Sequence, residues 1–327
     1  MLRKLLPDTY VIALLSTVAL ASLLPCRGDV AAMLGVLTHV AIAVLFFLHG
    51  AKLSREAVVA GFTHWRLHLT TLSVTFILFP VLGLAARPLL APWVGDTLYT
   101  GVLFLCMLPS TVQSSIAFTA MARGNVAASV CGASASNILG MFVTPLLVGL
   151  FVAQGSGAIS TDAIGSILVQ LLLPFIAGQA ARRWIGGWVR RRAPALKYVD
   201  QGSILLVVYT AFPAAVVEGL WSKVDGPALL GLLAISALLL SVVMLSTTFG
   251  ARALGFKRED EISFVFCGSK KSLATGVPMA KVLFAAPDVG MMVLPLMLFH
   301  QLQLMVCAVL AQRYARAETS DAASERA

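Results

Sequence analysis

Apolar runs long enough to cross a bilayer recur along this chain from Tyr10 to Leu310, with no long polar stretch between them. A helix needs about 20 apolar residues to span the hydrocarbon core of a membrane. Charged residues make up only 12% of the sequence, against about 25% in an ordinary soluble domain. The pattern excludes a soluble domain with a single anchor and predicts an all-α protein that crosses the membrane many times.

The apolar runs predict about ten transmembrane helices. The approximate spans are 9–24, 31–50, 66–90, 98–122, 126–152, 161–185, 196–221, 227–254, 262–284 and 289–310. Arg3 and Lys4 in front of the first run would also fit a secretory signal peptide. We favour a retained first span, because the apolar run starts after Pro7 and continues to Leu24.

Lysine and arginine are concentrated in alternate connections between the predicted spans. If the N-terminus lies inside, the outer loops contain only Arg27, Arg87 and Lys223. The positive-inside rule then predicts a multi-pass protein of the cell (inner) membrane with both termini in the cytoplasm and residues 316–327 as a cytoplasmic tail. This topology accounts for the net charge of +9, so the lipid bilayer is the expected partner and nucleic acid is not.

The most basic connection, 182–197, separates two blocks of five spans. It contains Trp184 and Trp188 and would form either a helix on the anionic inner leaflet or an ordinary cytoplasmic loop. Because five is odd, two related blocks would have opposite orientations, which is the inverted-repeat layout of many secondary transporters. The repeat halves are then about 1–155 and 156–315. We divide the chain into 1–185, which holds the first repeat and the sixth span, and 186–327.

Two of the predicted spans are interrupted at corresponding places. The fourth span contains Leu-Pro-Ser-Thr around Pro109, and the ninth contains Gly-Ser-Lys-Lys-Ser from Gly268. Paired broken helices in the two halves of a transporter indicate a binding site at their crossing. The alternative for the fourth span alone is that Pro109 only kinks a continuous helix.

Lys270 and Lys271 lie inside the ninth span between two apolar runs. A charge at that depth is costly, so it predicts a functional site. One lysine could meet an anionic substrate, and the other could replace a bound cation or exchange a proton. The alternative is a shorter helix whose lysines extend to the membrane surface. No acidic residue lies near the centre of any predicted span, so a cation site built on a buried carboxylate is not expected.

Other polar residues inside the spans are candidates for the same site. Ser129, Ser136 and Asn137 share one face of the fifth span, where they would either line a cavity or hold helices together. His300, with Gln301 and Gln303, interrupts the tenth span. Its depth matches the break in the ninth span and favours a site over simple packing.

Enzymatic and metal-binding motifs are absent from the sequence. There is no HExxH or GxSxG, and nothing orients a catalytic pair of Ser269 or Ser272 with a lysine. The cysteines have no metal-ligand spacing. We therefore predict no enzyme, no metal site and no cofactor.

The chain resembles the bile acid:sodium symporter family, and more closely its SBF-like branch (DUF4137). The resemblance covers nearly the whole chain and rests on the segments 121–127 and 268–279 and on His300-Gln301. It implies ten helices in two inverted repeats, with helices four and nine broken and crossing. Helices one, two, six and seven would form a panel and the others a core, and relative movement of the two would give alternating access.

The resemblance also implies roles for individual residues. The cation-site positions are Ser115, Ser129, Thr75, Ser269 and Lys270. Ser115 and Ser129 match hydroxyl ligands of sodium, but Phe266 stands where the family has a glutamate and Lys270 where it has a glutamine. These two replacements argue against sodium as a coupling ion. The positions implied to contact substrate are Lys271, His300, Gln301 and Gln113.

Together these observations predict a secondary transporter that moves a small organic anion, either bile-acid-like or carboxylated, by alternating access. An alternative is a membrane regulator with the same fold that no longer transports. A third hypothesis, an intramembrane hydrolase, requires a serine hydroxyl within hydrogen-bond reach of a lysine amine.

Overall fold

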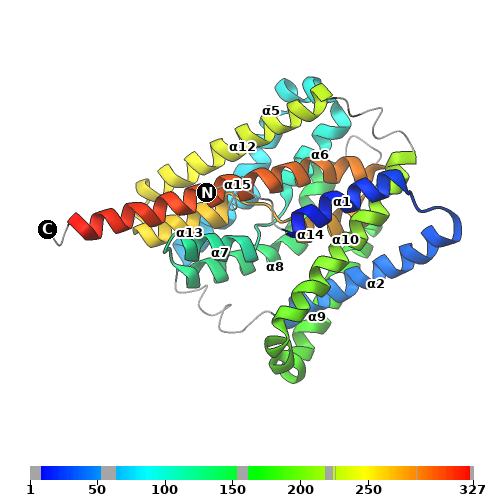
Figure 1. Cartoon of the computed structure of the whole chain (residues 1–327), viewed down its shortest axis with the longest axis horizontal. Helices are drawn as coiled ribbons and strands as arrows, with labels where there is room; N and C mark the ends of the chain where they lie inside the picture. Colours follow the sequence, from blue (N-terminus) through cyan, green and yellow to red (C-terminus); the bar gives the residue numbers. More distant parts are fainter. Residues whose placement is uncertain are drawn as a thin grey trace.

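The computed structural model describes residues 9–52, 64–152, 161–217, 224, 226–284 and 286–324. These residues are almost entirely helical, and no strand occurs among them (Figure 1). The helices are α1 (Thr9–Leu23), α2 (Gly28–Lys52), α4 (Trp65–Ser73), η2 (Val74–Leu78), α5 (Phe79–Val94), α6 (Asp96–Met107), α7 (Gln113–Met121), α8 (Val126–Phe151), α9 (Thr161–Arg191), α10 (Ala193–Val217), α12 (Gly226–Ala253), α13 (Arg258–Gly268), α14 (Leu273–Leu283) and α15 (Ala286–Ser324).

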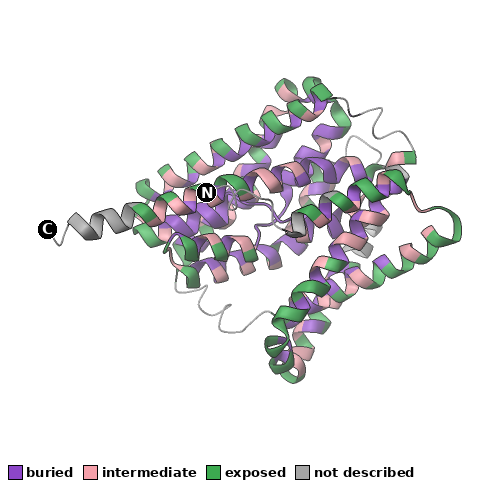
Figure 2. Cartoon of the chain, in the orientation of Figure 1, coloured by how far each residue is buried: buried purple, intermediate pink, exposed green. Residues whose placement is uncertain are grey.

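The apolar character of these helices confirms a multi-pass membrane protein. Within the described residues, five helical stretches are long and apolar enough to cross a bilayer: Gly28–Lys52, Trp65–Val94, Val126–Phe151, Gly226–Ala253 and Asp288–Arg316. The expected count of ten spans and their arrangement as inverted repeats stay predictions. Large apolar side chains such as Leu23, Leu89 and Trp93 remain at least 70% exposed, as lipid-facing positions should. In Figure 2 exposed residues of all kinds lie mainly along the outer faces of the helices, and buried ones lie inside.

Two groups of helices can be distinguished by their contacts. In the first, α2 packs along α9, α1 packs on α10, and α10 also contacts α2. The second group is built around α6, α13 and α15, which contact α5, α7, α8 and α12. The groups meet mainly where α10 lies against α14 and α15. There, Lys281 on α14 donates a hydrogen bond of 3.2 Å to the Thr210 carbonyl on α10.

Glycine allows α2 and α9 to approach backbone to backbone. A Cβ atom at Gly50 would collide with the Phe175 carbonyl, and one at Gly178 would collide with the Phe47 carbonyl. Small residues serve this purpose at helix contacts in membranes, where close packing replaces the hydrophobic drive.

The basic segment 182–197 is helical, so the prediction of a loop there is wrong. Residues 182–191 continue α9, and α10 begins at Ala193 after a turn at Arg192. The segment therefore consists of the adjoining ends of two long helices and is not a separate helix. The sequence itself is consistent with this, because no proline and only one glycine pair, Gly186-Gly187, interrupts it before Ala193.

Candidate functional site

Two chain interruptions meet inside the second group of helices. α6 ends at Met107 and α7 begins at Gln113, so Pro109 lies between them, while Ser269–Ser272 separates α13 from α14. The Ser272 amide donates to the Pro109 carbonyl at 2.9 Å. The Ser110 hydroxyl donates to the Cys267 carbonyl at 2.5 Å, and the Ser115 hydroxyl donates to the Phe266 carbonyl at 2.9 Å. Each break thus supplies partners for backbone groups that the other helix leaves unpaired at its end.

The ammonium group of Lys271 binds three backbone carbonyls. Its Nζ lies 2.7 Å from the Leu108 oxygen, 2.8 Å from the Cys106 oxygen and 2.9 Å from the Thr75 oxygen. Two of these carbonyls end α6, where no further helical turn can pair them. Since an ammonium has three N–H groups, this buried side chain has no donor left in this conformation. Substrate contact by Lys271 stays a prediction.

The third acceptor is available because of a local irregularity in the third predicted span. Residues Val74–Leu78 form a π-helix, in which the Phe79 amide bonds to the Val74 carbonyl. The next residue is Pro80, which has no N–H. The Thr75 carbonyl is therefore left without a helical partner, and Lys271 supplies one.

Lys270 has a different environment, although it is the next residue. Its side chain is also fully buried, but within the described part of the chain its Nζ has no hydrogen-bond partner. The Nζ lies 4.0 Å from the centre of the Phe118 ring and 5.4 Å from that of Phe266. Cation–π attraction to these rings is the interaction in the structure that offsets part of the cost of burying its charge.

Gln303 on α15 holds the backbone of Lys271 from both sides. Its Oε1 accepts from the Lys271 amide at 2.9 Å, and its Nε2 donates to the Lys271 carbonyl at 3.0 Å. The same Nε2 lies 2.8 Å from Nδ1 of His300. An amide nitrogen only donates, so Nδ1 is the acceptor and the network assigns the neutral imidazole with its proton on Nε2. Sequence reasoning named Gln303 only as a polar interruption and did not place it in the site.

The polar face of α8 supports the break at Pro109. Ser136 accepts a hydrogen bond of 3.0 Å from the Ser110 amide, and Asn137 donates one of 2.7 Å to the Ser110 carbonyl. At Gly140 a Cβ atom would lie only 2.6 Å from Cβ of Pro109, so α8 needs glycine there. Of the two interpretations of Ser136 and Asn137, the structure favours the one in which they hold the chain together.

The predicted cation-site hydroxyls are bonded to the protein itself. The Ser129 hydroxyl lies 2.7 Å from that of Thr119, the Thr75 hydroxyl donates to the Thr71 carbonyl, and Ser269 donates to the Val265 carbonyl. The Phe266 ring packs between those of Phe118 and Tyr314. Among the described residues, no cluster of histidine, cysteine, aspartate or glutamate side chains could hold a metal ion.

The remaining predicted substrate positions differ in burial. His300 and Gln301 are half-buried, and Gln113 is exposed at the first turn of α7. The Nε2 of Gln301 is buried without a hydrogen-bond partner among the described residues. Their contact with a substrate stays a prediction.

The hydrolase hypothesis lacks its required geometry. The Ser269 hydroxyl donates to a carbonyl of its own helix, and the Ser272 hydroxyl caps α14 by accepting from the Thr275 amide. In the described structure neither lysine amine is hydrogen-bonded to a serine hydroxyl.

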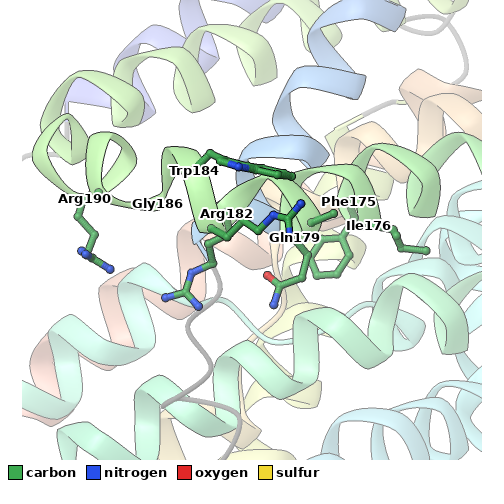
Figure 3. A pocket seen from close by; sticks show the side chains of 10 residues that line it. Phe175, Ile176, Gln179, Arg182, Trp184, Gly186 and Arg190 are labelled. Carbon is green, nitrogen blue, oxygen red and sulfur yellow. The ribbon is translucent and has the colours of Figure 1, made fainter.

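A hollow of about 900 Å³ lies along the C-terminal half of α9. Apolar side chains, among them Phe175 and Ile176, line it together with Gln179, Arg182 and Arg190. In Figure 3, Gln179 and Arg182 point away from α9 into the space between this helix and the neighbouring ones. All the residues that line the hollow belong to α9, so the basic side chains in it come from this helix alone.

The turn between α7 and α8 is hydrogen-bonded to the start of α13. The Asn125 amide donates to the Glu259 carbonyl at 2.9 Å, and its side chain donates to the Asp260 carboxylate at 2.8 Å. Its Oδ1 also caps α8 by accepting from the Ala128 amide. One residue therefore joins the ends of the two broken spans.

The sequence has relatives over its full length. It is 62% identical to the Uncharacterized protein PA2026 of Pseudomonas aeruginosa, over 98% of this chain and 97% of the relative. It is 56% identical to the Putative symporter YfeH of Escherichia coli, over 94% and 93%. It is 27% identical to Sodium/bile acid cotransporter 7 of Rattus norvegicus, over 95% and 93%. The relatives with a functional name are thus named as transporters.

The family match agrees with the residues described above, which carried the resemblance at the level of sequence. Residues 8–316 match the SBF-like CPA transporter family (DUF4137), so the match includes both interrupted helices and the histidine and glutamine residues of α15. The recognition made from the sequence is confirmed, and this chain belongs to the SBF-like CPA transporter family.

Proposed function

We propose that this protein is a secondary transporter that moves a small organic anion across the membrane by alternating access, without using sodium as the coupling ion. The observation that carries the proposal is the ammonium of Lys270, which is fully buried at the crossing and has no hydrogen-bond acceptor among the described residues. Two transporter names among the relatives, a symporter and a sodium/bile acid cotransporter, support the general activity.

An anion would supply the negative counter-charge that is missing beside the ammonium of Lys270. A buried ion is costly unless a counter-charge and hydrogen bonds compensate it. Lys271 donates hydrogen bonds to three carbonyl oxygens, but within the described structure Lys270 contacts only aromatic rings. A carboxylate or sulfonate beside Lys270 would provide both the missing charge and the missing acceptors.

A sodium ion fits this environment poorly. Two unit charges of the same sign 4 Å apart repel by about 4 kcal/mol even at an effective dielectric constant of about 20. The hydroxyls of Ser115 and Ser129 already have partners in the protein. Phe266, which replaces the acidic residue implied by the resemblance, offers a ring and no oxygen.

The two groups of helices give a basis for alternating access. α1, α2, α9 and α10 would act as the panel, and the group around α6, α13 and α15 would act as the core that contains the crossing. Movement at the α10 contacts with α14 and α15 would expose the crossing to one side at a time. The hollow along α9, with Arg182 and Arg190 in its lining, offers basic side chains that would attract an anion approaching from the cytoplasmic side.

Counterflow in proteoliposomes tests the proposal. Purified protein is reconstituted into liposomes loaded with unlabelled taurocholate or succinate, and uptake of the labelled anion is followed without any ion gradient. The wild type should take up one of these anions, and Lys270→Met should reduce the uptake at least about tenfold, as loss of a buried charge–charge contact predicts. The exposed Lys197→Gln is the matched control. Wild-type uptake no faster than in protein-free liposomes would refute the transport of these anion classes.

A further inference from the structure

We infer that this protein is an obligate anion exchanger, because the crossing carries fixed positive charge that must be compensated each time the carrier reorients. The inference rests on the proposed function, since it specifies how transport of the anion is coupled. It differs from the symport that two of the relatives' names describe.

The charge of Lys271 follows from its hydrogen bonds. Its Nζ donates to three carbonyl oxygens at 2.7 to 2.9 Å. A neutral amine has two N–H groups, so only the ammonium satisfies all three acceptors. The Phe79 ring, with its centre 4.1 Å from Nζ, adds a further contact that favours a cation.

The charge of Lys270 follows from the groups that surround it. Its Nζ faces the rings of Phe118 on α7 and Phe266 on α13. The negative faces of aromatic rings attract an ammonium and offer no comparable attraction to a neutral amine. These two ring contacts are the geometric reason for assigning Lys270 as an ammonium.

Among the residues that the structure describes, no carboxylate near the crossing offsets these two charges. The other ionisable groups around Lys270 are the thiols of Cys267 and Cys307 and the imidazole of His300. His300 is neutral in the hydrogen-bond network with Gln303. The acidic residues of α13 belong to its first turn at the cytoplasmic end, where Glu261 pairs with Arg252 and Asp260 with Asn125.

Fixed charge at a moving site limits which states can reorient. If the crossing moves from one membrane face to the other while its positive charge has no counter-charge, that step bears the full free-energy cost of desolvating the charge. With an anion beside Lys270, the same movement carries a compensated pair. The return step therefore needs an anion as well, which makes one anion exchange for another.

Trans-stimulation measures this directly. Labelled taurocholate is taken up by proteoliposomes that contain either unlabelled taurocholate or only potassium chloride, whose anion has no carboxylate or sulfonate group, with membrane voltage clamped by potassium and valinomycin. Succinate is tested in the same way. We expect uptake of the transported anion to be at least about tenfold faster into the anion-loaded liposomes. A tenfold ratio corresponds to about 1.4 kcal/mol.

Variants of Lys270 separate charge from shape. Lys270→Arg keeps a permanent charge and should keep the wild-type ratio between loaded and unloaded liposomes. Lys270→Met should bring this ratio close to one in whatever transport remains. Lys197→Gln, at an exposed position on α10, should leave both rates unchanged.

The outcomes distinguish the inference from the function on which it rests. Equal uptake into loaded and unloaded liposomes would overturn obligate exchange but leave anion transport established. Accumulation in unloaded liposomes driven by a pH gradient would overturn it too, because the lysine would then be releasing its proton. If neither anion is taken up into loaded liposomes, both proposals fall. An unchanged ratio of uptake into loaded and unloaded liposomes in Lys270→Met would show that the charge of Lys270 does not cause the exchange requirement. If that variant does not fold, the ratio measured for the wild type alone decides whether exchange is obligate.

Discussion

The side-chain amide of Gln303 forms two hydrogen bonds with the main chain of Lys271. Its amide oxygen accepts from the Lys271 N–H at 2.9 Å, and its amide nitrogen donates to the Lys271 carbonyl at 3.0 Å. Both groups lie in the break between α13 and α14, where no helical partner is available. Gln303 is completely buried, so water does not compete for these bonds. The residue fixes the backbone from which both lysine side chains extend.

Replacing Gln303 by leucine should therefore destabilise the protein. Two backbone groups lose their partners, and each unsatisfied buried group costs about 1–3 kcal/mol. We expect a clear fall in the melting temperature of the detergent-purified protein. Gln301→Leu is the comparison on the same helix, because the Nε2 of Gln301 has no partner among the described residues. An equal fall in both variants would contradict the pairing.

The two lysines should differ in what their removal does. Lys271→Met leaves the Thr75, Cys106 and Leu108 carbonyls without the ammonium, which should cost about 3 kcal/mol or more. Lys270→Met breaks no hydrogen bond that the structure shows, and it replaces a charge by an apolar group of similar size in a buried place. Thermal unfolding should therefore rank Lys271→Met well below both Lys270→Met and the wild type. The reverse order would contradict the assigned roles.

Pro80 and Lys271 should be energetically coupled. Pro80→Ala restores an N–H that can reach the carbonyl left free by the π-helix, so part of the role of Lys271 passes to the backbone. The double variant Pro80→Ala, Lys271→Met should lose less stability than the two single losses added together, by about 1 kcal/mol. If the stability losses of the two single variants add exactly in a double-mutant cycle, the hydrogen bond from Lys271 to the Thr75 carbonyl contributes no coupling energy.

Asn125 should contribute more to stability than its partner Asp260. Asn125→Ala removes a helix cap, worth about 0.5–2 kcal/mol, as well as the bond to the carboxylate. Asp260→Ala removes only that bond. The melting temperature should fall further for Asn125→Ala. A larger fall for Asp260→Ala would place the main contact elsewhere.

The contact between α2 and α9 should tolerate no side chain at Gly178. Gly178→Val would force a side chain into the Phe47 carbonyl of α2, and the two helices would have to separate. Gly187→Ala, farther along α9, meets no atom within 4 Å and serves as the control. We expect poor yield and a lowered melting temperature only for the first variant, measured by fluorescence size-exclusion chromatography.

Sodium should have no specific effect on the purified protein. The cation-site positions carry an ammonium, a phenyl ring and hydroxyls that already have partners, so there is no favourable site for the ion to fill. Melting temperatures in sodium chloride and potassium chloride of equal concentration should agree. A saturable stabilisation by sodium alone would restore sodium coupling as a hypothesis.

The helical character and the place of the breaks could be predicted from the order of residues. Long apolar runs have only one way to satisfy their backbone in a bilayer, which is to form helices. Pro109 and the Gly-Ser-Lys-Lys-Ser segment from Gly268 cannot continue such a run without penalty. The motifs at these breaks also carried the family resemblance. For the basic end of α9, the same reasoning left a loop and a separate interfacial helix as alternatives, although arginine is a good helix former and the residues continue α9 to Arg191.

What each lysine contacts was decided only by the tertiary structure. Lys270 and Lys271 have the same chemistry and adjacent positions, so the sequence could not distinguish them. Their side chains leave an irregular backbone in different directions. Lys271 reaches the Thr75 carbonyl, 196 residues earlier in the chain, and that carbonyl is free only because η2 departs from the α-helical pattern. The sequence therefore predicted two lysines inside a membrane-spanning segment, and long-range packing determined that, among the described residues, Lys271 is hydrogen-bonded and Lys270 is not.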